Sequence, residues 1–244
     1  MKILAMDSSG LVASVALVCD GVMIAEYTTN FKKTHSQTLL PMIDEIVKMT
    51  GIALEEIDAI AVAAGPGSFT GLRIGSSTAK GLGLALKKPI IPVPTVEGIA
   101  YNLFGMNKLV CPIMDARRNQ VYTGLYTFDA GAMNVISEQK AVSIDEIVEE
   151  INNLNMEDYS ISCKEVVFLG DGVPVFKDFI IENCKVPVSF APAHMAMQRA
   201  GAVAVRAEYY YGQGKVEPAA EHKPDYLRLS QAEREMQEKQ EQKQ

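Results

Sequence analysis

The strongest constraint on the fold of this chain is an apolar segment that leads into a helix lined with small residues. Residues 61–64 read as a buried strand, which ends at Gly65-Pro66-Gly67 and precedes a predicted helix over residues 70–86. Small residues recur at every fourth position of that helix and therefore share one face. We call this face the small-residue stripe; it consists of Gly71, Gly75, Ala79 and Gly83.

The glycines of this helix carry an energetic cost that something must offset. Each glycine inside a helix costs about 1 kcal/mol relative to alanine. The four at positions 71, 75, 81 and 83 together cost about 4 kcal/mol, against a typical domain stability of about 5–15 kcal/mol. We therefore expect another helix, a partner chain or a ligand at the helix N-terminus to press closely against the stripe.

The predicted elements form two halves with one common order. In the first half we expect strands 3–9, 13–19 and 22–28, helix 35–49, strand 59–64, helix 70–86, strand 90–93 and helix 96–104. In the second half we expect strands 109–115, 120–128 and 133–140, helix 144–154, strand 165–169, helix 174–183, strand 186–190 and helix 193–211. Both halves read βββαβαβα, with an aspartate closing the first strand.

This duplicated order predicts the two-lobed α/β architecture of the actin, Hsp70 and sugar-kinase (ASKHA) superfamily. We expect an N-terminal lobe over residues 1–104, a C-terminal lobe over residues 105–228 and a polar tail over residues 229–244. For the last helix, 193–211, we consider packing on the first lobe as well as on its own.

Composition restricts the class of protein. The chain has 244 residues, of which 48% are hydrophobic and 22% charged, as in an ordinary globular protein. It has no signal-peptide pattern and no apolar run long enough to span a membrane, and its four cysteines are scattered. We therefore expect a cytoplasmic protein with reduced thiols. The net charge of −7 argues against a direct grip on nucleic-acid phosphates, so any role near RNA is expected to be indirect.

The turns that follow the first strand of each half are the candidate nucleotide site. In a two-lobed nucleotide-binding fold such turns face the cleft and present small residues and backbone N–H groups. Asp7, Ser8 and Ser9, followed by Gly10, fit this role. The second turn, with Asp115 and Arg117, has no glycine and two bulky arginines, so a productive ATP clamp is not favoured. Asp7 also has a simpler interpretation, as a turn residue that satisfies its own backbone amides.

The sequence contains neither a histidine pair typical of a metal site nor a motif typical of a nucleophilic hydrolase. His35, His194 and His222 have no histidine three or four residues away, and Gly-x-Ser-x-Gly does not occur. We therefore predict no catalytic residues and no metal ligands. His35 is expected to cap a helix or contact a partner. Arg73 is expected either to be solvated or to pair with a partner's carboxylate.

At this point the sequence resembles the TsaB (YeaZ) family, the bacterial partner of the catalytic subunit TsaD. The residues that carry the resemblance are Asp7-Ser8-Ser9, His35-Ser36, Leu39-Leu40-Pro41, the block 65–75, Ala79-Lys80-Gly81-Leu82, Asp115-Ala116-Arg117 and Pro224-Asp225-Tyr226-Leu227-Arg228. The match is close over residues 1–104, whereas residues 129–190 contribute little. The metal-binding His-x-x-x-His pair of TsaD falls at Thr95 and Ile99 of this chain, and isoleucine cannot ligate a metal.

The resemblance implies a non-catalytic accessory subunit, a pseudoenzyme required for N6-threonylcarbamoyladenosine (t6A) at position 37 of tRNAs that read ANN codons. It implies action with TsaD and the P-loop ATPase TsaE in transferring threonylcarbamoyl from threonylcarbamoyl-AMP. It also implies a homodimer when the chain is alone, indirect contact with tRNA, no membrane and no intrinsic cofactor, with ATP or ADP at the multi-subunit interface. The implied interface comprises His35, Leu39, Leu40, Ile43, Gly65, Pro66, Gly67, Ser68, Phe69, Thr70, Gly71, Leu72, Arg73, Gly75 and Ala79.

Two other classes of function stay open on the sequence. A small-molecule kinase or ATPase of the same fold is supported by the duplicated architecture and the first turn, and opposed by Arg117 and Arg118. A metallopeptidase is suggested only by older views of this superfamily, and the lack of a histidine pair opposes it.

Overall fold

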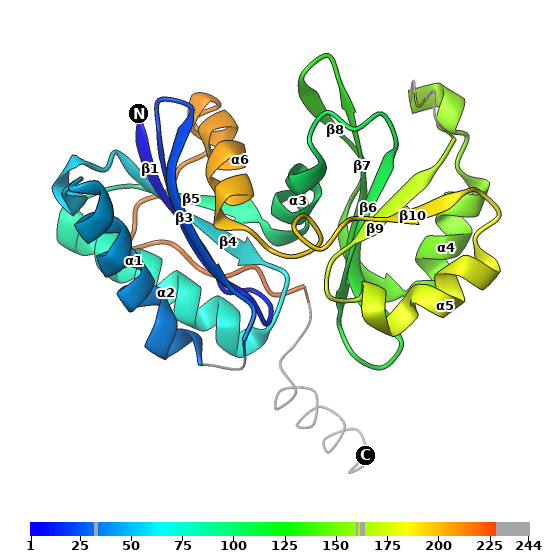
Figure 1. The fold of residues 1–244 in the computed structure, drawn as a ribbon, viewed down its shortest axis with the longest axis horizontal. Coiled ribbons are helices and arrows are strands. Elements are labelled where there is room, and N and C mark those ends of the chain that lie inside the picture. The colour runs from blue at the N-terminus through cyan, green and yellow to red at the C-terminus, as the bar shows by residue number, and fades with distance from the viewer. Residues whose placement is uncertain (32–33, 160, 162–163, 228–244) are drawn as a thin grey trace, which may run out of the picture.

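The computed structural model describes residues 1–31, 34–159, 161 and 164–227, and it contains two five-stranded sheets (Figure 1). The first sheet comprises β1 (Lys2–Asp7), β2 (Ala13–Cys19), β3 (Val22–Thr29), β4 (Ala59–Gly65) and β5 (Ile90–Pro94). The second comprises β6 (Leu109–Asp115), β7 (Gln120–Asp129), β8 (Ala132–Ser143), β9 (Val166–Leu169) and β10 (Val188–Phe190). Their spatial orders, β3-β2-β1-β4-β5 and β8-β7-β6-β9-β10, are equivalent.

The pairing directions repeat as well. In each sheet the first strand is antiparallel to the second and parallel to the fourth. The predicted duplicated α/β architecture of the actin, Hsp70 and sugar-kinase group is therefore confirmed. The predicted lobe boundary stays a prediction, and the tail 229–244 lies outside the described residues.

Two helices cover one face of each sheet. Helices α1 (His35–Thr50) and α2 (Phe69–Leu86) lie side by side on the first sheet, and α4 (Ile144–Asn153) and α5 (Val173–Asn183) cover the second (Figure 1). Helix α1, predicted over residues 35–49, buries Leu39, Ile43 and Ile46. Pro41 lies inside this helix, which nevertheless begins at His35. Within the described residues no helix is long and apolar enough to cross a membrane.

The third helix of each half packs on the sheet of the other half. Helix α3 (Thr95–Ala100), which continues as a 3-10 turn, packs on the second sheet, and α6 (Ala200–Gly212) packs on the first. A buried ion pair joins the two helices: Arg206 Nε donates to Glu97 Oε2 at 2.8 Å, and Tyr210 Oη donates to the same oxygen at 2.6 Å. This exchange ties the two halves together, and the suggestion that the last helix packs back on the first lobe is confirmed.

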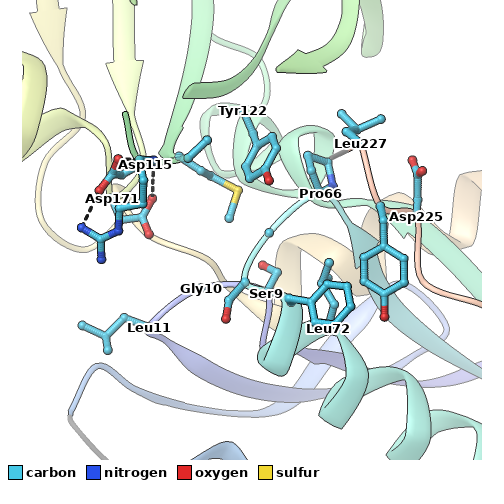
Figure 2. A pocket seen from close by; sticks show the side chains of 17 residues that line it. Ser9, Gly10, Leu11, Pro66, Leu72, Asp115, Tyr122, Asp171, Asp225 and Leu227 are labelled. Carbon is cyan, nitrogen blue, oxygen red and sulfur yellow. Dashed lines mark hydrogen bonds and ion pairs between the residues drawn. The ribbon is translucent and has the colours of Figure 1, made fainter. Parts of the chain in front are cut away.

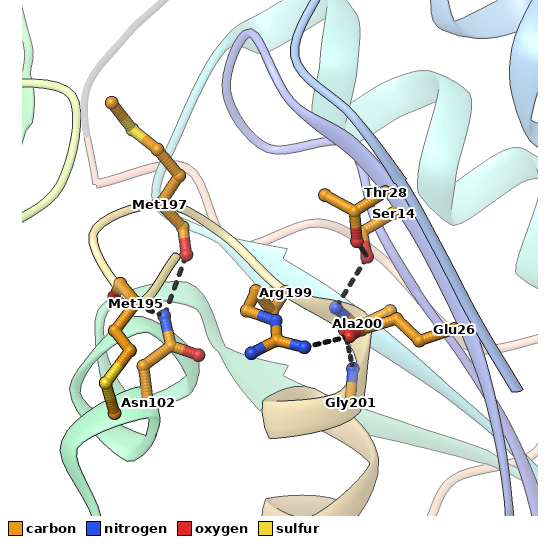
Figure 3. A network of polar contacts seen from close by, with 9 residues as sticks. All are labelled: Ser14, Glu26, Thr28, Asn102, Met195, Met197, Arg199, Ala200 and Gly201. Carbon is orange, nitrogen blue, oxygen red and sulfur yellow. Dashed lines mark hydrogen bonds and ion pairs between the residues drawn. The ribbon is translucent and has the colours of Figure 1, made fainter. Parts of the chain in front are cut away.

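The predicted start of the last helix at residue 193 was wrong, because the connection before α6 is held in an irregular path (Figure 3). Asn102 Nδ2 donates to the carbonyls of Met195 at 3.1 Å and Met197 at 2.7 Å. The N-terminus of α6 is then held by the first sheet: Ser14 Oγ accepts from Ala200 N–H at 2.8 Å. Glu26 accepts from Gly201 N–H at 2.9 Å and pairs with Arg199. These partners lie about ninety or more residues away in sequence, beyond the reach of a local pattern.

After α6 the chain returns along the first half as a segment that we call the C-terminal strap, residues 215–227. Glu217 and Ile90 exchange two backbone hydrogen bonds of 2.9 Å, so the strap adds a bridge to the free edge of β5. The strap then follows α2 towards the turn that precedes this helix. The motif at residues 224–228, of which the structure describes 224–227, was noted only as a family resemblance, and the role of the strap was not predicted.

Candidate functional site

The small-residue stripe of α2 faces the protein's own interior. A Cβ atom at Gly71 would lie 2.0 Å from the carbonyl oxygen of Ser8, and one at Gly75 would lie 2.5 Å from Ser8 Oγ. One at Gly83 would lie 2.7 Å from the Cβ of Ala219 in the strap. Ser8 Oγ also donates to the Gly71 carbonyl at 2.8 Å. The predicted close approach is real, but it is made within the chain, by the turn after β1 and by the strap.

This result corrects the predicted interface. Eight of its residues are buried within the chain and expose little surface on the outer side of α1 and α2: Leu39, Ile43, Gly65, Pro66, Gly71, Leu72, Gly75 and Ala79. The physical reason is that Leu39, Ile43 and Ala79 pack in the core between α1, α2 and the first sheet, while Gly71 and Gly75 lie against Ser8 in the turn after β1. The accessible part comprises His35, Leu40, Gly67, Ser68, Phe69, Thr70 and Arg73; as a partner surface, it stays a prediction.

Arg73 is not simply solvated, because its guanidinium has partners within the chain. Its guanidinium lies over the ring of Phe69, 4.0 Å from the centroid, and its Nε donates to the hydroxyl of Tyr226 at 3.3 Å. The rings of Phe69 and Tyr226 are themselves in contact, with centroids 4.6 Å apart. Arg73 therefore connects the exposed side of α2 to the end of the strap, a contact that sequence reasoning did not find.

A pocket of about 550 Å³ lies between the two halves (Figure 2). One wall is formed by the turn after β1 and by residues 66–69, and another by residues 114–117 and Asp171 at the ends of strands of the second sheet. The last strap residues, 225–227, close a third side. Ligands of open α/β sheets bind at such carboxyl ends of strands, so this pocket is the candidate site.

The first of the two predicted nucleotide turns is used internally. Asp7 is 1% exposed, and its Oδ1 accepts from Ser9 N–H at 2.8 Å and from Ser9 Oγ at 2.6 Å. Burial raises the pKa of Asp7, against the opposing effect of these hydrogen bonds. Only Ser9 of the predicted Asp7-Ser8-Ser9 set lines the pocket. The simpler interpretation of Asp7, as a turn residue, is confirmed.

The second turn has an unusual backbone and lines the pocket directly. Arg117, Arg118 and Asn119 adopt left-handed conformations, with φ of 64°, 56° and 59°. Such a conformation costs about 1–2 kcal/mol for a non-glycine residue. Asp115 compensates for part of this cost, because its carboxylate accepts from Arg117 N–H at 2.8 Å and pairs with Arg117 Nη1 at 3.0 Å.

The charges around the pocket are mainly negative. Asp115 and Asp171 lie next to each other at one end, and Asp225 lies at the other (Figure 2). Asp171 Oδ1 accepts from Asp115 N–H at 3.2 Å, and burial raises the pKa of Asp171, with a further contribution from the charge of Asp115. Arg117, the cation among the lining residues, already pairs with Asp115. Three carboxylates against one paired guanidinium disfavour a polyphosphate here.

A histidine and an acid of the strap meet a serine of α2, a grouping that was not predicted from the sequence. His222 Nε2 lies 2.9 Å from Ser76 Oγ, and its Nδ1 bonds to Glu217. The three residue types are those of a hydrolytic triad. However, Ser76 is 5% and His222 3% exposed, and neither lines the pocket between the two halves, so the group holds the strap on α2. No local signal could have found it, because Ser76 and His222 are 146 positions apart.

The remaining predicted positions also have internal partners. His35 Nε2 bonds to the carbonyl of Gly10 at 2.8 Å, which links α1 to the first turn. Thr95 is the first residue of α3, and its hydroxyl accepts from Gly65 N–H at 3.1 Å. Ile99 is fully buried among apolar side chains.

Comparison with known proteins identifies close relatives. The family model described as "TsaD: tRNA N6-adenosine threonylcarbamoyltransferase" matches residues 23–236. The tRNA threonylcarbamoyladenosine biosynthesis protein TsaB of Bacillus subtilis (strain 168) is 34% identical over 235 residues, which cover 96% of each protein. The protein of the same name from Escherichia coli (strain K12) is 38% identical over 152 residues, covering 62% of this chain and 65% of that protein.

A solved structure shows the same overall fold. YeaZ from Pseudomonas aeruginosa superimposes with a TM-score of 0.77 at 25% identity, covering 93% of this chain and 99% of that one. The Bacillus match also extends the resemblance well beyond residues 1–104, to almost the entire chain.

Proposed function

Because this chain belongs to the TsaB (YeaZ) family of tRNA threonylcarbamoyladenosine biosynthesis proteins, we propose that it is the non-catalytic accessory subunit of the t6A-forming complex. In this proposal it acts in the cytoplasm with a TsaD-type catalytic paralogue and a TsaE-type ATPase. The paralogue transfers threonylcarbamoyl from threonylcarbamoyl-AMP to N6 of adenosine 37 in tRNAs that read ANN codons. The tRNA is contacted through the complex, ATP or ADP is held only at the multi-subunit interface, and the chain alone forms a homodimer.

The observation that carries the proposal is the chemistry of the interlobe pocket. Phosphoryl and acyl-phosphate chemistry needs donors or cations aimed at the phosphate oxygens. Here the first turn directs its aspartate and serine hydroxyl at each other, 2.6 Å apart, and the second turn presents Asp115 with its neighbour Asp171. These side chains support a structural role for the pocket and leave the transfer step to a partner.

The two positions that match the metal-binding histidines of TsaD support the same assignment. Thr95 and Ile99 are both fully buried, and each serves the packing of α3. The threonine hydroxyl is bonded to Gly65 N–H, and the isoleucine side chain has no atom that could ligate a metal. These positions therefore favour a non-catalytic chain that keeps the fold of TsaD and acts by binding the catalytic subunit.

The exposed side of α1 and α2 is the surface that we assign to the catalytic paralogue and, in its absence, to a second copy. It carries accessible apolar side chains, Leu40 on α1 and Leu84 on α2, which are 55% and 54% exposed, and α2 also exposes Thr70 and Arg73. A substitution at Gly75 does not test this surface, because a bulky side chain there would collide with Ser8 inside the chain.

The proposed function is tested by depletion and restoration. We expect the t6A content of bulk tRNA, measured by mass spectrometry of nucleosides, to fall when the protein is depleted and to recover with the intact chain. Leu40→Asp should prevent recovery and complex formation on size exclusion, since a charge placed in an apolar interface core is strongly unfavourable. Ile181→Asp on α5, at a site 51% exposed, is the matched control and should restore t6A fully. Unchanged t6A after depletion, or full activity of Leu40→Asp, would contradict the proposal.

A further inference from the structure

The C-terminal strap is fixed firmly at one end and held by exposed contacts at the other. At its beginning Glu217 bridges to Ile90, and Ala219 is buried against Gly83. His222 is then bonded to both Glu217 and Ser76, and its carbonyl accepts from Lys80 Nζ at 3.4 Å. Because these contacts are backbone pairs or buried polar bonds, this part of the strap is an anchor.

The last residues of the strap, 225–227, touch both halves of the molecule and line the interlobe pocket. Asp225 N–H donates to the Ala64 carbonyl at 2.7 Å in the first half, while its carboxylate accepts from Gln139 Nε2 of β8 at 3.2 Å in the second. Tyr226 is 39% exposed, and its ring lies on Phe69. The side chains of Asp225 and Tyr226 are exposed and make exposed contacts, so within the described part of the strap this end has the lower local stability.

Arg73 is the side chain that joins this end to the outer surface. It is exposed on the side of α2 that also bears Thr70 and Ser77, and it reaches back to Phe69 and Tyr226. A carboxylate offered from outside would bind a guanidinium through charge-assisted hydrogen bonds, which are stronger than a cation–π contact at an exposed ring. Such a carboxylate would therefore draw Arg73 away from Tyr226.

We propose that residues 225–227 are a latch over the interlobe pocket, opened when a partner's carboxylate engages Arg73. The identity of that partner, the catalytic paralogue docked on α1 and α2, rests on the proposed function; the latch itself is a property of the isolated chain. Opening would release Tyr226 from Phe69, free the Asp225 amide and widen the pocket on its third side. Binding on the surface of α2 would thereby be transmitted to the pocket between the halves.

Hydrogen exchange of the peptide spanning residues 220–227 tests the latch in the isolated chain. Arg73→Ala removes the cation–π contact and the hydrogen bond to Tyr226, so exchange of the Asp225 amide should become about fivefold faster. Lys177→Ala is the matched control, because Lys177 makes a similar cation–π contact with Phe190 in the other half, 5.1 Å from its centroid. It should leave this exchange unchanged. Equal rates in Arg73→Ala and the intact chain would overturn the latch.

A fluorescence measurement checks the same motion independently, since the chain contains no tryptophan. Tyr226→Trp places an indole on Phe69, and adding Arg73→Ala should increase its quenching by acrylamide. Tyr211→Trp is the control because Tyr211 has the same exposed fraction, 39%, on α6; Arg73→Ala should not affect it. A similar increase for both indoles would indicate general loosening and would overturn the latch.

The third experiment measures the same hydrogen exchange in the complex with the catalytic paralogue. When the complex forms on size exclusion, exchange of residues 220–227 should rise as it does in Arg73→Ala. Slower or unchanged exchange within a formed complex would overturn opening by the partner. Failure of the two proteins to associate would instead contradict the proposed function, and the isolated-chain measurements would still decide whether the latch exists.

Discussion

The turns after β1 and after β6 occupy equivalent places in the two halves, yet they are used differently. Each follows a strand that ends in an aspartate. Asp7 is almost fully buried and accepts a hydrogen bond from Ser9 N–H, while the glycines of α2 pack against the neighbouring Ser8. Asp115 lines the pocket and serves Arg117, in a turn with three left-handed residues.

The difference shows how one architecture can be adapted in two directions. In the first half, glycines at 71 and 75 allow α2 to approach the turn so closely that Asp7 and Ser8 are buried, and only the later residues of the turn, from Ser9 on, line the pocket. In the second half, α5 has no comparable stripe, and the turn stays open to the pocket. The aspartate of the first turn is bonded to Ser9 and does not line the pocket, whereas Asp115 of the second turn does. This difference is the physical basis on which we propose that the chemistry belongs to a partner.

The largest expected effect comes from filling the space between α2 and the first turn. Gly71→Ala would place a methyl group 2.0 Å from a backbone oxygen, so we expect a loss of about 3 kcal/mol or more in the free energy of unfolding. Gly81→Ala, in the same helix with nothing within 4 Å, should raise stability by up to about 1 kcal/mol. Urea denaturation of both variants measures this; similar stabilities would show that the stripe is not packed internally.

The role of Asp7 is tested by two substitutions. Asp7→Ala removes the acceptor of two buried Ser9 donors and should cost about 1–3 kcal/mol. Asp7→Asn keeps an acceptor oxygen and removes a buried charge, so it should be at least as stable as the intact chain at neutral pH. It should also support t6A formation. A folded Asp7→Asn variant that fails to support t6A would give Asp7 a chemical role.

The pH dependence of stability separates Asp171 from an ordinary surface carboxylate. Burial raises its pKa in the folded protein, so the folded state binds its proton more tightly than the unfolded state. Stability should therefore fall as the pH rises from the usual aspartate value through the raised one. Asp171→Asn should lessen this fall in thermal unfolding curves recorded from acidic to neutral pH. Parallel curves for the two proteins would contradict the burial of its charge.

The sequence predicted the elements well and their long-range partners poorly. Periodicity and turn residues indicated the ten strands of the described fold and a helix over residues 144–154, which the structure has as α4, capped by Ser143 Oγ accepting from Glu146 N–H at 3.2 Å. The stripe was recognised as a contact surface, but its partners, Ser8 and Ala219, lie about sixty and more than a hundred positions away. Arg73, Ser76 and His222 likewise acquire their roles only when the strap folds back on α2.

The smallest expected effect concerns the strained second turn. Arg118→Gly relieves a left-handed conformation with φ of 56°, while glycine adds freedom to the unfolded chain. We expect a net gain of a few tenths of a kcal/mol in stability. If instead t6A formation fell without loss of stability, the open turn would take part in the reaction, and the comparison between the two turns would need revision.

The central claim is that this chain enables a transfer performed by another subunit. Its most direct test is transfer of labelled threonylcarbamoyl from threonylcarbamoyl-AMP to adenosine 37 of an ANN-decoding tRNA, with each protein present or omitted. The account predicts sustained transfer with the catalytic paralogue, the ATPase and this chain together, and none with this chain alone. Transfer by the isolated chain, or full activity of the other two proteins without it, would contradict the account.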